Sequence, residues 1–567
     1  MHDFEALKTR SLTTLLIEKG FAPAQILTSD EYCTQTTYNP NYPISTIVKP
    51  MPVESTNDSE RYVQLTTLIS TAKEYGFSIH PVSKGLNLGY GGFEAYSNSV
   101  IVDLSNFTRI NNFDEKTGQI TVEPGVTQEA ISQFLKDKGN VFIHDTTGAP
   151  KQASVVGNYL ERGFGHTPLA EHAKNILHAQ VIVPLAKHQQ PALFITSMDG
   201  VLTTQNKIKT YNIGPDSTGL VIQNNIGVVT SLTIKLLRTP SQFVAYFIPF
   251  NKSIAGEMID VCAQLRAQGT IHSAAHIGNN IKSLQLLAVE YPGLIDSYNL
   301  NDLEKAMNSL HLDDWTLSGG FYGTRAQVSA HKKDLKKAMR TLSLTPIFIG
   351  PKMQKTLRTL ERYLAKYKNK ITRAIHSKHQ FIRKIAAKLL MVPGLNALCD
   401  IKQGTPSNYF LKSIYWRNLQ KRTIGNLSPE VDNVGLLWGA PCSSIESTAF
   451  SAITQLMENK CQKYGLECPI SVTLLNDRTM ESVLSLSFDR GNEAEVNNAM
   501  NCYEEIMLCA AEIGFVQYRM STFANSFLEY KHLFIDKPLL NHKALLDPCN
   551  VISPSKYSLM SDNFTTK

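Results

Sequence analysis

The sequence predicts an α+β protein of two domains, and three observations lead to that prediction. The chain has 567 residues, more than a single hydrophobic core usually organises. Hydrophobic residues make up 43% and charged residues 19%, which is ordinary for a globular chain and excludes global disorder. Helix-like and strand-like segments alternate without forming a regular strand–helix–strand array. We therefore expect an α+β domain followed by a second domain.

The first domain is expected over residues 44–240, after an N-terminal helical segment over 1–43. Its helices show apolar spacing and end signals such as Gly76, a residue type common just after a helix. Its strands are short and contain β-branched residues. The predicted helices are Tyr62–Gly76 and Thr127–Lys138, and the predicted strands are Phe77–Val82, Ser99–Leu104, Gln119–Glu123, Ala179–Pro184 and Val228–Leu236.

A restart of long helices and strands after Pro240 predicts a second domain over 241–510, and residues 511–567 return to short motifs. Between Lys352 and Lys388 the chain carries twelve Lys or Arg and one acid, Glu361, a net charge of +11. Because the whole chain carries +7, the remainder carries −4 and is mildly acidic. The basic character is therefore local, which argues against a nucleic-acid-binding protein.

No apolar run is long enough to cross a bilayer, and the first twenty residues carry six charged side chains instead of a signal-peptide core. These features predict a cytoplasmic protein with no transmembrane segment. The nine cysteines are scattered, and the pair Cys461 and Cys468 lacks the spacing of a zinc site. We expect free, mostly buried thiols and no metal site.

A glycine-rich loop within Pro81–Gly92 follows the first predicted strand and holds four glycines in eight residues. Such a loop lets backbone N–H groups approach and surround a pyrophosphate. A lone loop of this kind is more often a surface turn. Here it is accompanied by Gly148–Asn158, by Gly163-Phe164-Gly165 and by Asn225–Thr230 at the start of a strand. Together and in this order these segments predict a dinucleotide site.

A longer series of motifs runs in a fixed order along the chain. It comprises Pro81–Gly92, Val102–Leu104, Val122–Thr127, Gly157–Gly165, Gly227–Thr230, Gln403-Gly404-x-Pro406, Leu436-Leu437-Trp438, Gln517-Tyr518-Arg519 and Leu546-Asp547-Pro548. In this order the motifs resemble the vanillyl alcohol oxidase and p-cresol methylhydroxylase family. The resemblance covers most of the chain, from about Ile44 to Tyr557.

The resemblance implies a fold in which the N-terminal domain and a C-terminal return segment hold FAD, while the middle domain caps the flavin and closes the substrate cavity. It also implies an FAD-dependent oxidoreductase acting on a small molecule, with the flavin supplying the redox chemistry. Dimers are common in this family, so by analogy we also expect a possible homodimer. The residues expected at the cofactor are Ser83, Lys84, Gly85, Leu86, Asn87, Leu88, Gly89, Gly92, Gly148, Ser154, Gly157, Asn158, Gly227, Val228 and Val229.

Tyr90, Tyr518 and Arg519 match the positions at which family members that oxidise 4-alkylphenols hold the phenolic oxygen. A phenol loses its proton only at about pH 10, so binding it as phenolate needs a cation and strong donors. Arg519 supplies a permanent charge, and the two hydroxyls can donate. A phenolate releases electrons toward its para carbon, which favours hydride loss to flavin N5. Both residues could instead have purely structural roles: Tyr90 could cover the edge of the flavin, and Arg519 could pair with a structural carboxylate.

Several positions depart from the family pattern. Leu436 stands where many members carry a His or Tyr bound covalently to the flavin, and Leu86 stands where another branch carries a histidine. We therefore expect FAD without a covalent tether. His80 and His144 lie near predicted loops, and a satisfied structural histidine is the expectation at both.

The catalytic base is left open by the sequence. Ala149 stands close to the position of an aspartate beside flavin N5 in vanillyl alcohol oxidase, and Asp145 is four residues earlier. His166 stands where the family commonly has tyrosine. A substrate-facing acid or base and a change in packing explain His166 equally well.

Apolar residues recur at roughly helical spacing within the basic segment and predict a basic amphipathic helical insertion near 352–390. A helix with a solvated cationic face is the simpler interpretation. The alternative is a docking surface for an acidic protein partner, an electron acceptor or an anionic membrane. The apolar stripe consists of Leu357, Leu360, Leu364, Tyr367, Ile371 and Ile375, and Lys332, Lys333, Lys336 and Lys337 would extend the basic patch.

Three functions fit the sequence. The first is oxidation of a para-substituted phenol through Tyr90, Tyr518 and Arg519. The second is oxidation of a specialised, carrier-bound or free metabolite, which Ala149 and His166 favour. The third is a non-catalytic protein that binds a partner through the basic segment, and the intact glycine loops count against it. Oxygen, a cytochrome and a quinone-like carrier are all chemically feasible electron acceptors.

Overall fold

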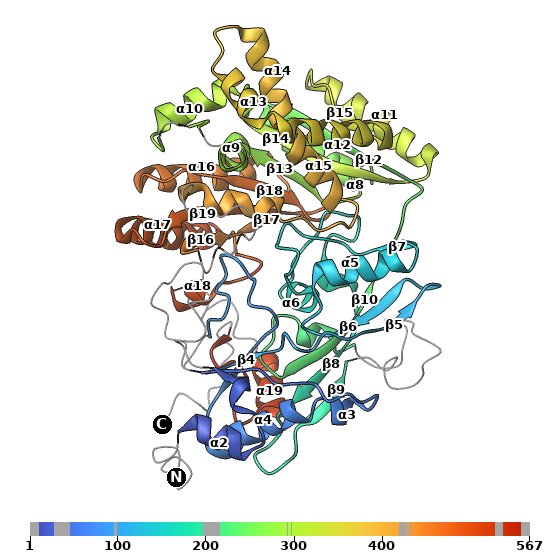
Figure 1. Ribbon diagram of the computed structural model, residues 1–567, viewed down its shortest axis with the longest axis vertical. Helices are drawn as coiled ribbons and strands as arrows, with labels where there is room; N and C mark the ends of the chain where they lie inside the picture. The colour runs from blue at the N-terminus through green and yellow to red at the C-terminus, as the bar shows by residue number, and fades with distance from the viewer. Residues whose placement is uncertain are drawn as a thin grey trace.

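The computed structural model describes residues 11–27, 46–95, 99–196, 216–291, 293–295, 297–418, 427, 429, 432–527 and 537–556. These residues form two blocks, which Figure 1 shows one above the other. The lower block contains a four-stranded sheet, a five-stranded sheet and a two-stranded ribbon with small helices, and the upper block contains one large sheet covered by helices on both faces. The α+β class expected from the sequence is confirmed.

A small mixed sheet in the order β1-β2-β4-β3 forms one part of the lower block. β2 and β3 run parallel to β4, and helix α4 buries Leu65, Leu68 and Ile69 against them. α4 ends before Gly76, whose φ of 73° lies in the left-handed region that favours glycine. The bounds are α2 Leu12–Glu18, η1 Pro23–Gln25, β1 Ile26–Leu27, β2 Ile47–Val48, α3 Asp58–Arg61, α4 Val63–Tyr75, β3 Ile79–Val82 and β4 Val100–Asp103.

The second sheet of the lower block is antiparallel, in the order β5-β6-β10-β8-β9. Helix α5 begins after Thr127, whose hydroxyl accepts the N–H of Ala130 at 3.1 Å and caps the helix. The bounds are β5 Ile110–Asp114, β6 Gln119–Val122, α5 Gln128–Asp137, β7 Phe142–Ile143, α6 Val155–Leu160, η2 His172–Asn175, β8 Ile176–Val183, β9 Ala192–Ile195, η3 Thr218–Val221, β10 Val228–Lys235 and β11 Leu237–Arg238, with β7 pairing β11.

The C-terminal segment returns to the lower block through helix α19, Lys537–Leu546, as the sequence analysis expected. The backbone N–H of Ile79 donates to Val551 at 2.7 Å, and Ser553 donates back to Ile79 at 2.8 Å, so this segment extends the small sheet. The buried ammonium of Lys543 pairs with Asp547 at 2.5 Å and donates to the carbonyl of Asn225 at 2.5 Å. Residues from opposite ends of the chain therefore complete one block.

The upper block is built on an antiparallel sheet in the order β15-β12-β14-β13-β18-β19-β16, with β17 pairing β19. One face is apolar and packs on helices α8, α11, α16 and α17 in the main core cluster. The bounds are β12 Gln242–Phe250, β13 Ala275–Asn279, β14 Trp315–Gly323, β15 Ile347–Ile349, β16 Val434–Gly439, β17 Cys442–Ser444, β18 Ile470–Leu474, β19 Thr479–Asp489, α8 Ala255–Ala267, α11 Arg325–Thr341, α16 Ser447–Lys463 and α17 Glu493–Glu512.

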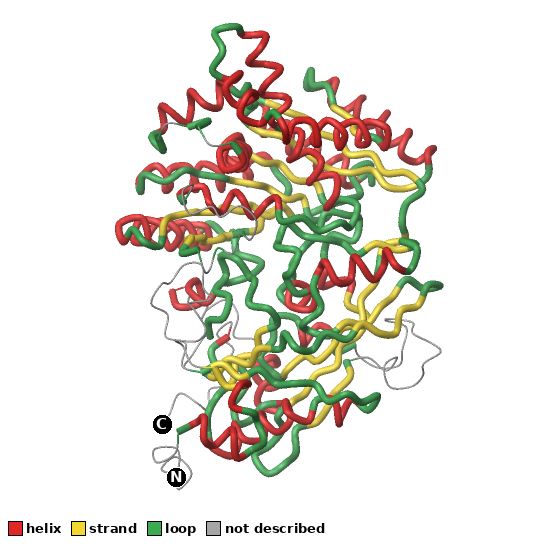
Figure 2. The backbone as a smooth tube through the Cα atoms, viewed as in Figure 1, coloured by secondary structure: helices red, strands yellow, loops and turns green. Residues whose placement is uncertain are grey.

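The opposite face of this sheet looks toward a second set of helices, seen in Figure 2 as red tubes above the yellow strands. A cavity lies between this set and the sheet. The bounds of the set are α9 Asn280–Glu290, α10 Leu300–Ser309, α12 Pro351–Lys366, α13 Lys368–Ile375, α14 Gln380–Leu390, α15 Val392–Ile401 and η5 Tyr409–Arg417. Two short elements, η4 Lys252–Ile254 and α18 Thr522–Phe527, adjoin α8 and α17 instead.

The basic insertion is not the single amphipathic helix that its apolar stripe predicts. It forms α12, α13 and α14, and the first break falls at Tyr367, where the backbone leaves helical geometry. The break has a packing reason: Leu357 contacts one core cluster, beside β12 and α15, whereas Ile371 and Ile375 contact another, beside α9 and α10. Tyr367 itself is exposed, so the stripe is interrupted at the bend.

Among the described residues no helix is long and apolar enough to span a bilayer.

Candidate active site

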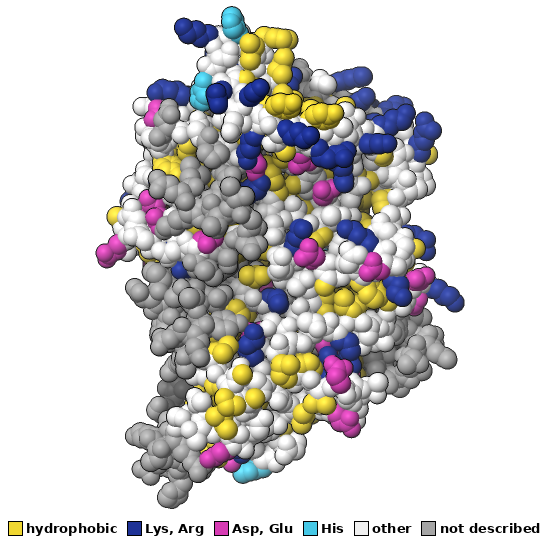
Figure 3. Space-filling model, viewed as in Figure 1, with side chains coloured by type: hydrophobic (Ala, Val, Ile, Leu, Met, Phe, Trp, Pro, Cys, Tyr) yellow, Lys and Arg dark blue, Asp and Glu magenta, His cyan; other side chains and the backbone are white. Residues whose placement is uncertain are grey.

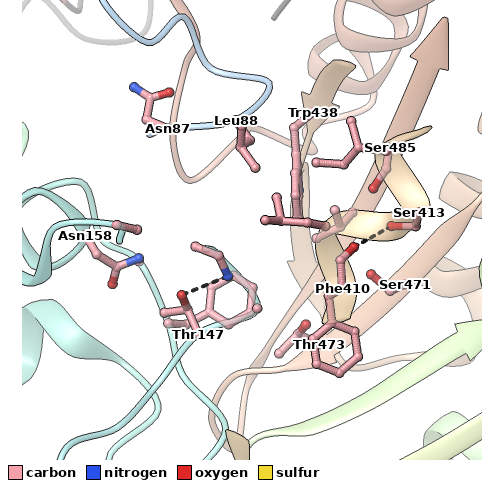
Figure 4. Close-up of a pocket in the computed structure, with 18 of the residues that line it drawn as sticks. Asn87, Leu88, Thr147, Asn158, Phe410, Ser413, Trp438, Ser471, Thr473 and Ser485 are labelled. Atoms are coloured by element: carbon pink, nitrogen blue, oxygen red, sulfur yellow. Dashed lines mark hydrogen bonds between the residues drawn. The ribbon is translucent and has the colours of Figure 1, made fainter. Parts of the chain in front are cut away.

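One cavity of about 1270 Å³ extends from the glycine loops of the lower block to the helix-covered face of the large sheet. Figure 4 shows Asn87, Leu88 and Asn158 of the lower block facing Trp438 and Ser485 of the upper block across this space. Loops of the lower block therefore form one wall, and strands of the large sheet form the opposite wall. Any molecule bound between them touches both blocks.

The loop after β3 needs its glycines for both conformation and space. Gly85 and Gly89 have φ values of 67° and 77°, in the region that favours glycine. A Cβ atom on Gly89 would lie 2.6 Å from the Cβ of Trp438, and a Cβ on Gly85 would lie 2.0 Å from the ring of Phe93. The loop therefore passes close to the large sheet at Gly89, where a side chain would collide with Trp438, whereas a side chain at Gly85 would collide with Phe93 within the lower block.

Most residues that the sequence assigned to the cofactor line this cavity. Two do not: Gly89 lies against Trp438, and Val228 points into the core of the lower block, because successive side chains along β10 face opposite sides. Those that line the cavity are Ser83, Lys84, Gly85, Leu86, Asn87, Leu88, Gly92, Gly148, Ser154, Gly157, Asn158, Gly227 and Val229.

The cradle formed by these loops fits FAD. Gly148 faces the cavity, and a Cβ built on it meets no atom within 4 Å, so that position is open rather than packed. Ser154 caps α6 by accepting the N–H of Gly157 at 3.0 Å, which fixes the second loop. Lys84 adds a cation to the lining. Exposed loop amides and a cation are the groups that an anionic pyrophosphate needs.

Tyr90, Tyr518 and Arg519 converge on one part of the cavity wall. The hydroxyl of Tyr90 donates to that of Tyr518 at 3.4 Å, and the guanidinium carbon of Arg519 lies 4.4 Å from the centre of the Tyr90 ring. Gln223 donates its amide to the carbonyl of Tyr518 at 2.8 Å and so fixes this stretch against the lower block. Two distant segments of chain therefore form one donor cluster.

Burial keeps both tyrosines protonated. Loss of solvent raises the pKa of Tyr90 well above its ordinary value, and Tyr518 is shifted in the same direction for the same reason. The nearby carboxyl of Glu481 is fully buried with no hydrogen-bond partner among the described residues, and burial raises its pKa well above the usual range. Proximity of Glu481 raises the pKa of both tyrosines further, which also favours their protonated form.

Arg519 also lies 3.7 Å from the carboxylate of Glu161, as the structural alternative for this residue supposed. Lys556 contacts the same carboxylate at 2.7 Å, so one acid serves two cations. These three groups together keep one net positive charge.

His166 lines the cavity beside a histidine that the sequence analysis missed, His276 of β13. The two ring centres are 4.4 Å apart, and His276 is fixed by Thr473 at 3.0 Å. Nδ1 of His166 and Nε2 of His276 have no partner among the described residues. Burial, each other's proximity and the charge of Lys402 lower the pKa of His166 well below its ordinary value, so the ring is neutral.

Lys402, at the end of α15, is fully buried, and its ammonium has no hydrogen-bond partner in the described part of the chain. Loss of solvent lowers its pKa to about 8. The carbonyl of Lys402 accepts the hydroxyl of Tyr322 at 2.6 Å, so its backbone is held in place. A cation in this position favours electron-rich groups near His166 and His276.

The sequence analysis also missed a row of hydroxyls on the large sheet. Ser471 and Thr473 of β18 and Ser485 of β19 face the cavity, as Figure 4 shows. Lys282 of α9 lies over the ring of Trp438 at 5.6 Å and donates to Ser485 at 2.8 Å. Alternation of polar and apolar residues along β18 and β19 was the available signal, but it suggests a solvent-exposed face just as readily.

An arm of the cavity continues away from the tyrosines, between the large sheet and helices α14 and α15. Its lining is largely apolar, with Ala387, Met391, Leu395, Leu398 and Ile349 among the contributing residues. The volume of about 1270 Å³ covers the loop cradle and this arm together. The arm gives the cavity apolar space beyond the part that Tyr90, Tyr518 and Arg519 line.

Comparison with known proteins agrees with this architecture. Residues 60–188 match the model of the FAD binding domain family. The chain is 25% identical over 503 residues to 1'-carboxy-chondrochloren decarboxylase of Chondromyces crocatus, covering 87% of this chain and 88% of that protein. It is 22% identical over 511 residues to the flavoprotein subunit of 4-cresol dehydrogenase (hydroxylating) of Pseudomonas putida, covering 88% and 87%.

Two solved structures share the fold over nearly the whole chain. The 4-ethylphenol oxidase of Gulosibacter chungangensis superimposes with a TM-score of 0.78 at 18% identity, covering 98% of each chain. Substrate-bound p-cresol methylhydroxylase gives a TM-score of 0.76 at 19% identity, covering 98% of this chain and 97% of that one. Over nearly its whole length the chain is therefore similar to flavoproteins of the p-cresol methylhydroxylase type. It is an FAD-dependent oxidoreductase.

Within this family, Leu436 occupies the position at which many members tether the flavin, and its side chain lines the cavity on β16. His80 also lines the cavity, and its Nδ1 contacts the hydroxyl of Ser553 at 2.9 Å, which fits the satisfied structural histidine that was expected. His144 differs from that expectation: it is buried beside Tyr159, and neither ring nitrogen has a partner among the described residues.

This chain has no carboxylate at the position that matches the aspartate beside flavin N5 in vanillyl alcohol oxidase. Ala149 lines the cavity at that position. Asp145 is buried instead, and its Oδ1 accepts the backbone N–H groups of His166 and Thr167 at 2.9 and 3.0 Å. A Cβ on Gly165 would collide with this carboxylate at 2.2 Å, so the turn is built around it. Asp145 therefore positions His166 rather than facing the cavity.

Proposed function

We propose that the protein oxidises a para-substituted phenol, or a related aromatic alcohol, bound as its phenolate by Tyr90, Tyr518 and Arg519. The observation that carries this proposal is the convergence of the three side chains on the cavity wall, with the hydroxyls 3.4 Å apart and the guanidinium 4.4 Å from the Tyr90 ring centre. No sequence motif alone brings together residues 428 positions apart.

The electrostatics of the cluster support an anionic oxygen as its ligand. Both tyrosines stay protonated and can donate, and hydrogen bonds to a charged acceptor are roughly twice as strong as neutral ones. Arg519 adds a permanent charge that Glu161 shares with Lys556. A phenolate held here releases electron density toward its para carbon, which weakens the C–H bonds of the attached carbon. Bound FAD would supply the hydride acceptor.

His166 is proposed as the group that handles the proton. Its ring is neutral and faces the cavity, so it can accept a proton from a water molecule or hydroxyl that adds to the oxidised substrate. Asp145 fixes the backbone of His166, and His276 packs against its ring. The pair takes the place of the carboxylate that Ala149 lacks.

We also propose that FAD is held without a covalent bond, because Leu436 has no group that could form one. Acid precipitation of the purified protein should then leave yellow flavin in the supernatant. Flavin that stays with the pellet and fluoresces on a denaturing gel would contradict this.

The decisive experiment is the visible spectrum of the purified protein, recorded without oxygen before and after addition of 4-alkylphenols and 4-hydroxybenzyl alcohols. Bleaching of the flavin by a phenol would support the proposal, and the same alcohols lacking the para hydroxyl serve as the matched control. A flavin that is never bleached by any phenol would refute the phenol assignment while leaving the family unaffected.

A second candidate is oxidation of a larger specialised metabolite, and the apolar arm of the cavity is the observation that favours it. The chain is similar to a protein named as the decarboxylase of 1'-carboxy-chondrochloren. A phenol carrying a long apolar substituent would satisfy both candidates. A series of test phenols with para substituents of increasing length distinguishes the two candidates. An affinity that rises with substituent length supports the larger substrate, and an affinity that falls steeply supports the small phenol.

A further inference from the structure

The three helices of the basic insertion leave large apolar side chains in solvent. We call their outer surface the insertion face and define it by Met353, Tyr363, Tyr367, Phe381, Ile382 and Ile385, which are between 42% and 74% exposed. Single exposed apolar residues are common on proteins, but a group of them on adjacent helices is characteristic of an interaction surface. The insertion face therefore needs an explanation.

Helix α14 carries apolar side chains on two opposite sides. Ala386, Ala387 and Leu390 on one side of the helix are buried in a core cluster with α9 and α10. Phe381 and Ile385, on the other side, are 74% and 44% exposed. The helix is thus apolar on both its buried and its outer side. An outer apolar side that remains largely exposed in the described chain fits a contact with another surface.

Cations surround these apolar residues. Twelve Lys or Arg lie between 352 and 388, and among the described residues only Arg358 and Lys368 are in ion pairs, with Asp400 and Glu290. In Figure 3 dark-blue and yellow side chains gather together at the top of the molecule, where Figure 1 places α13 and α14. Lys332 and Lys336 of α11 lie over Phe348 and continue the basic surface, as the sequence suggested.

We propose that the insertion face docks on an anionic lipid surface. Helices that carry aromatic and aliphatic residues among unpaired cations bind the bilayer interface by inserting the apolar groups while the cations meet acidic head groups. Each Lys or Arg near an anionic membrane contributes roughly fivefold in affinity. An acidic protein partner would account for the unpaired cations, but it would leave exposed Phe381 and Ile382 without an apolar counterpart.

The apolar arm of the cavity supports the same partner. The arm reaches the surface at Lys384 and Lys388, which both line the cavity and are exposed on α14, one turn apart. Phe381 and Ile385 of the insertion face lie on the same helix. Docking would bring the end of the arm to the lipid interface. An apolar molecule dissolved in the bilayer could then reach the cavity without crossing water.

The test measures binding of the FAD-loaded full chain to sedimented vesicles of phosphatidylcholine, with and without an equal share of phosphatidylglycerol. We expect binding to the anionic vesicles only, weakened by added salt. Phe381→Ser with Ile385→Ser, and separately Lys370→Glu with Lys378→Glu, should each weaken binding by roughly tenfold or more. The matched controls are Ile513→Ser with Leu508→Ser and Lys116→Glu with Lys138→Glu, exposed residues outside the insertion, which should leave binding unchanged.

Three outcomes would overturn the proposal. The first is no binding to either vesicle, or equal binding to both. The second is unchanged binding in both insertion variants, whose flavin spectra report that they remain folded. The third is a solution dimer that Phe381→Ser with Ile385→Ser converts to a monomer, since the insertion face would then contact a second copy. The proposal does not depend on the phenol chemistry, and vesicle binding is measured without substrate.

Discussion

The hydroxyl of Tyr90 donates to the hydroxyl of Tyr518 at 3.4 Å, although 428 residues separate them in the chain. One comes from the glycine loop of the lower block, and the other follows the last long helix of the upper block. Their contact depends on the correct docking of the two blocks. A phenol site at this point would therefore form only in the fully folded protein.

Tyr518→Phe should weaken binding of a 4-alkylphenol by roughly tenfold or more, because a hydrogen bond to a charged oxygen contributes about 1.5–3 kcal/mol. Arg519→Gln should weaken it further and should also shift binding to higher pH, since the enzyme would no longer favour the phenolate. Both effects are measured by titrating the flavin spectrum anaerobically. Tyr409→Phe removes a hydroxyl elsewhere in the same cavity and is the matched control. Equal affinities in all three variants would exclude this phenol site.

Gly148→Ala should lower the affinity for FAD while the protein keeps its thermal stability. A Cβ at Gly148 meets no protein atom within 4 Å, so any loss must come from contact with the cofactor. Gly219→Ala is the control, because Gly219 is equally unobstructed but does not line the cavity. The flavin-to-protein absorbance ratio after dialysis reports the result. Full flavin content in Gly148→Ala would show that this loop does not contact FAD.

His166→Asn should lower turnover by roughly a hundredfold or more if His166 carries the proton. Because its pKa lies well below the ordinary value, the wild-type rate should show no acid limb at about pH 6.5, where an ordinary histidine titrates. The measurement is kcat against pH, with His188→Asn, an exposed histidine, as the control. An unchanged rate in His166→Asn would assign His166 a packing role only.

Lys402→Met should stabilise the protein at pH 7 by on the order of 1–3 kcal/mol, because it removes a buried and unpartnered cation. The pKa of Lys402 is about 8 in the folded chain, below its ordinary value of 10.5. Between these values the unfolded chain holds a proton that the folded chain has released, so stability rises with pH across this window. Below pH 8 the full destabilising effect is present. Thermal melts at pH 7 and pH 10 measure both effects.

Lys543→Met provides the contrast. Lys543 is equally buried but pairs with Asp547 and donates to two backbone carbonyls. Its removal leaves the buried carboxylate of Asp547 without this cation, although the backbone N–H groups of Val551 and Ile552 still donate to it, and should destabilise by about 3–5 kcal/mol. If Lys402→Met destabilised as strongly as Lys543→Met, then Lys402 would have a partner that its surroundings do not reveal.

The glycine loops were predictable because their constraint is local. Gly85 and Gly89 have a left-handed backbone and leave no space for a Cβ atom, and only glycine satisfies both conditions. These positions can therefore be recognised in the sequence. His276 and Lys402 could not be recognised in this way. His276 lies in a strand and Lys402 at a helix end, with no local motif around either residue. Their positions depend on how the large sheet packs on the lower block.

The basic insertion illustrates a different limit. The spacing of apolar residues correctly predicted helices with an apolar side. It could not predict the bend at Tyr367, because the residues before and after the bend pack into two different core clusters. The exposure of Phe381 and Ile385 was equally hidden, since a sequence shows that a residue is apolar but not that its neighbours already fill the core.

Ile79 of strand β3 donates to Val551 and accepts from Ser553, so the lower block is closed by the final part of the described chain. During synthesis, a ribosome must release nearly all of the upper block before this contact can form. The cofactor loops would spend that interval beside an unfinished sheet, with long-range contacts still to be made. The lower block therefore cannot close until the strands of the upper sheet have been synthesised.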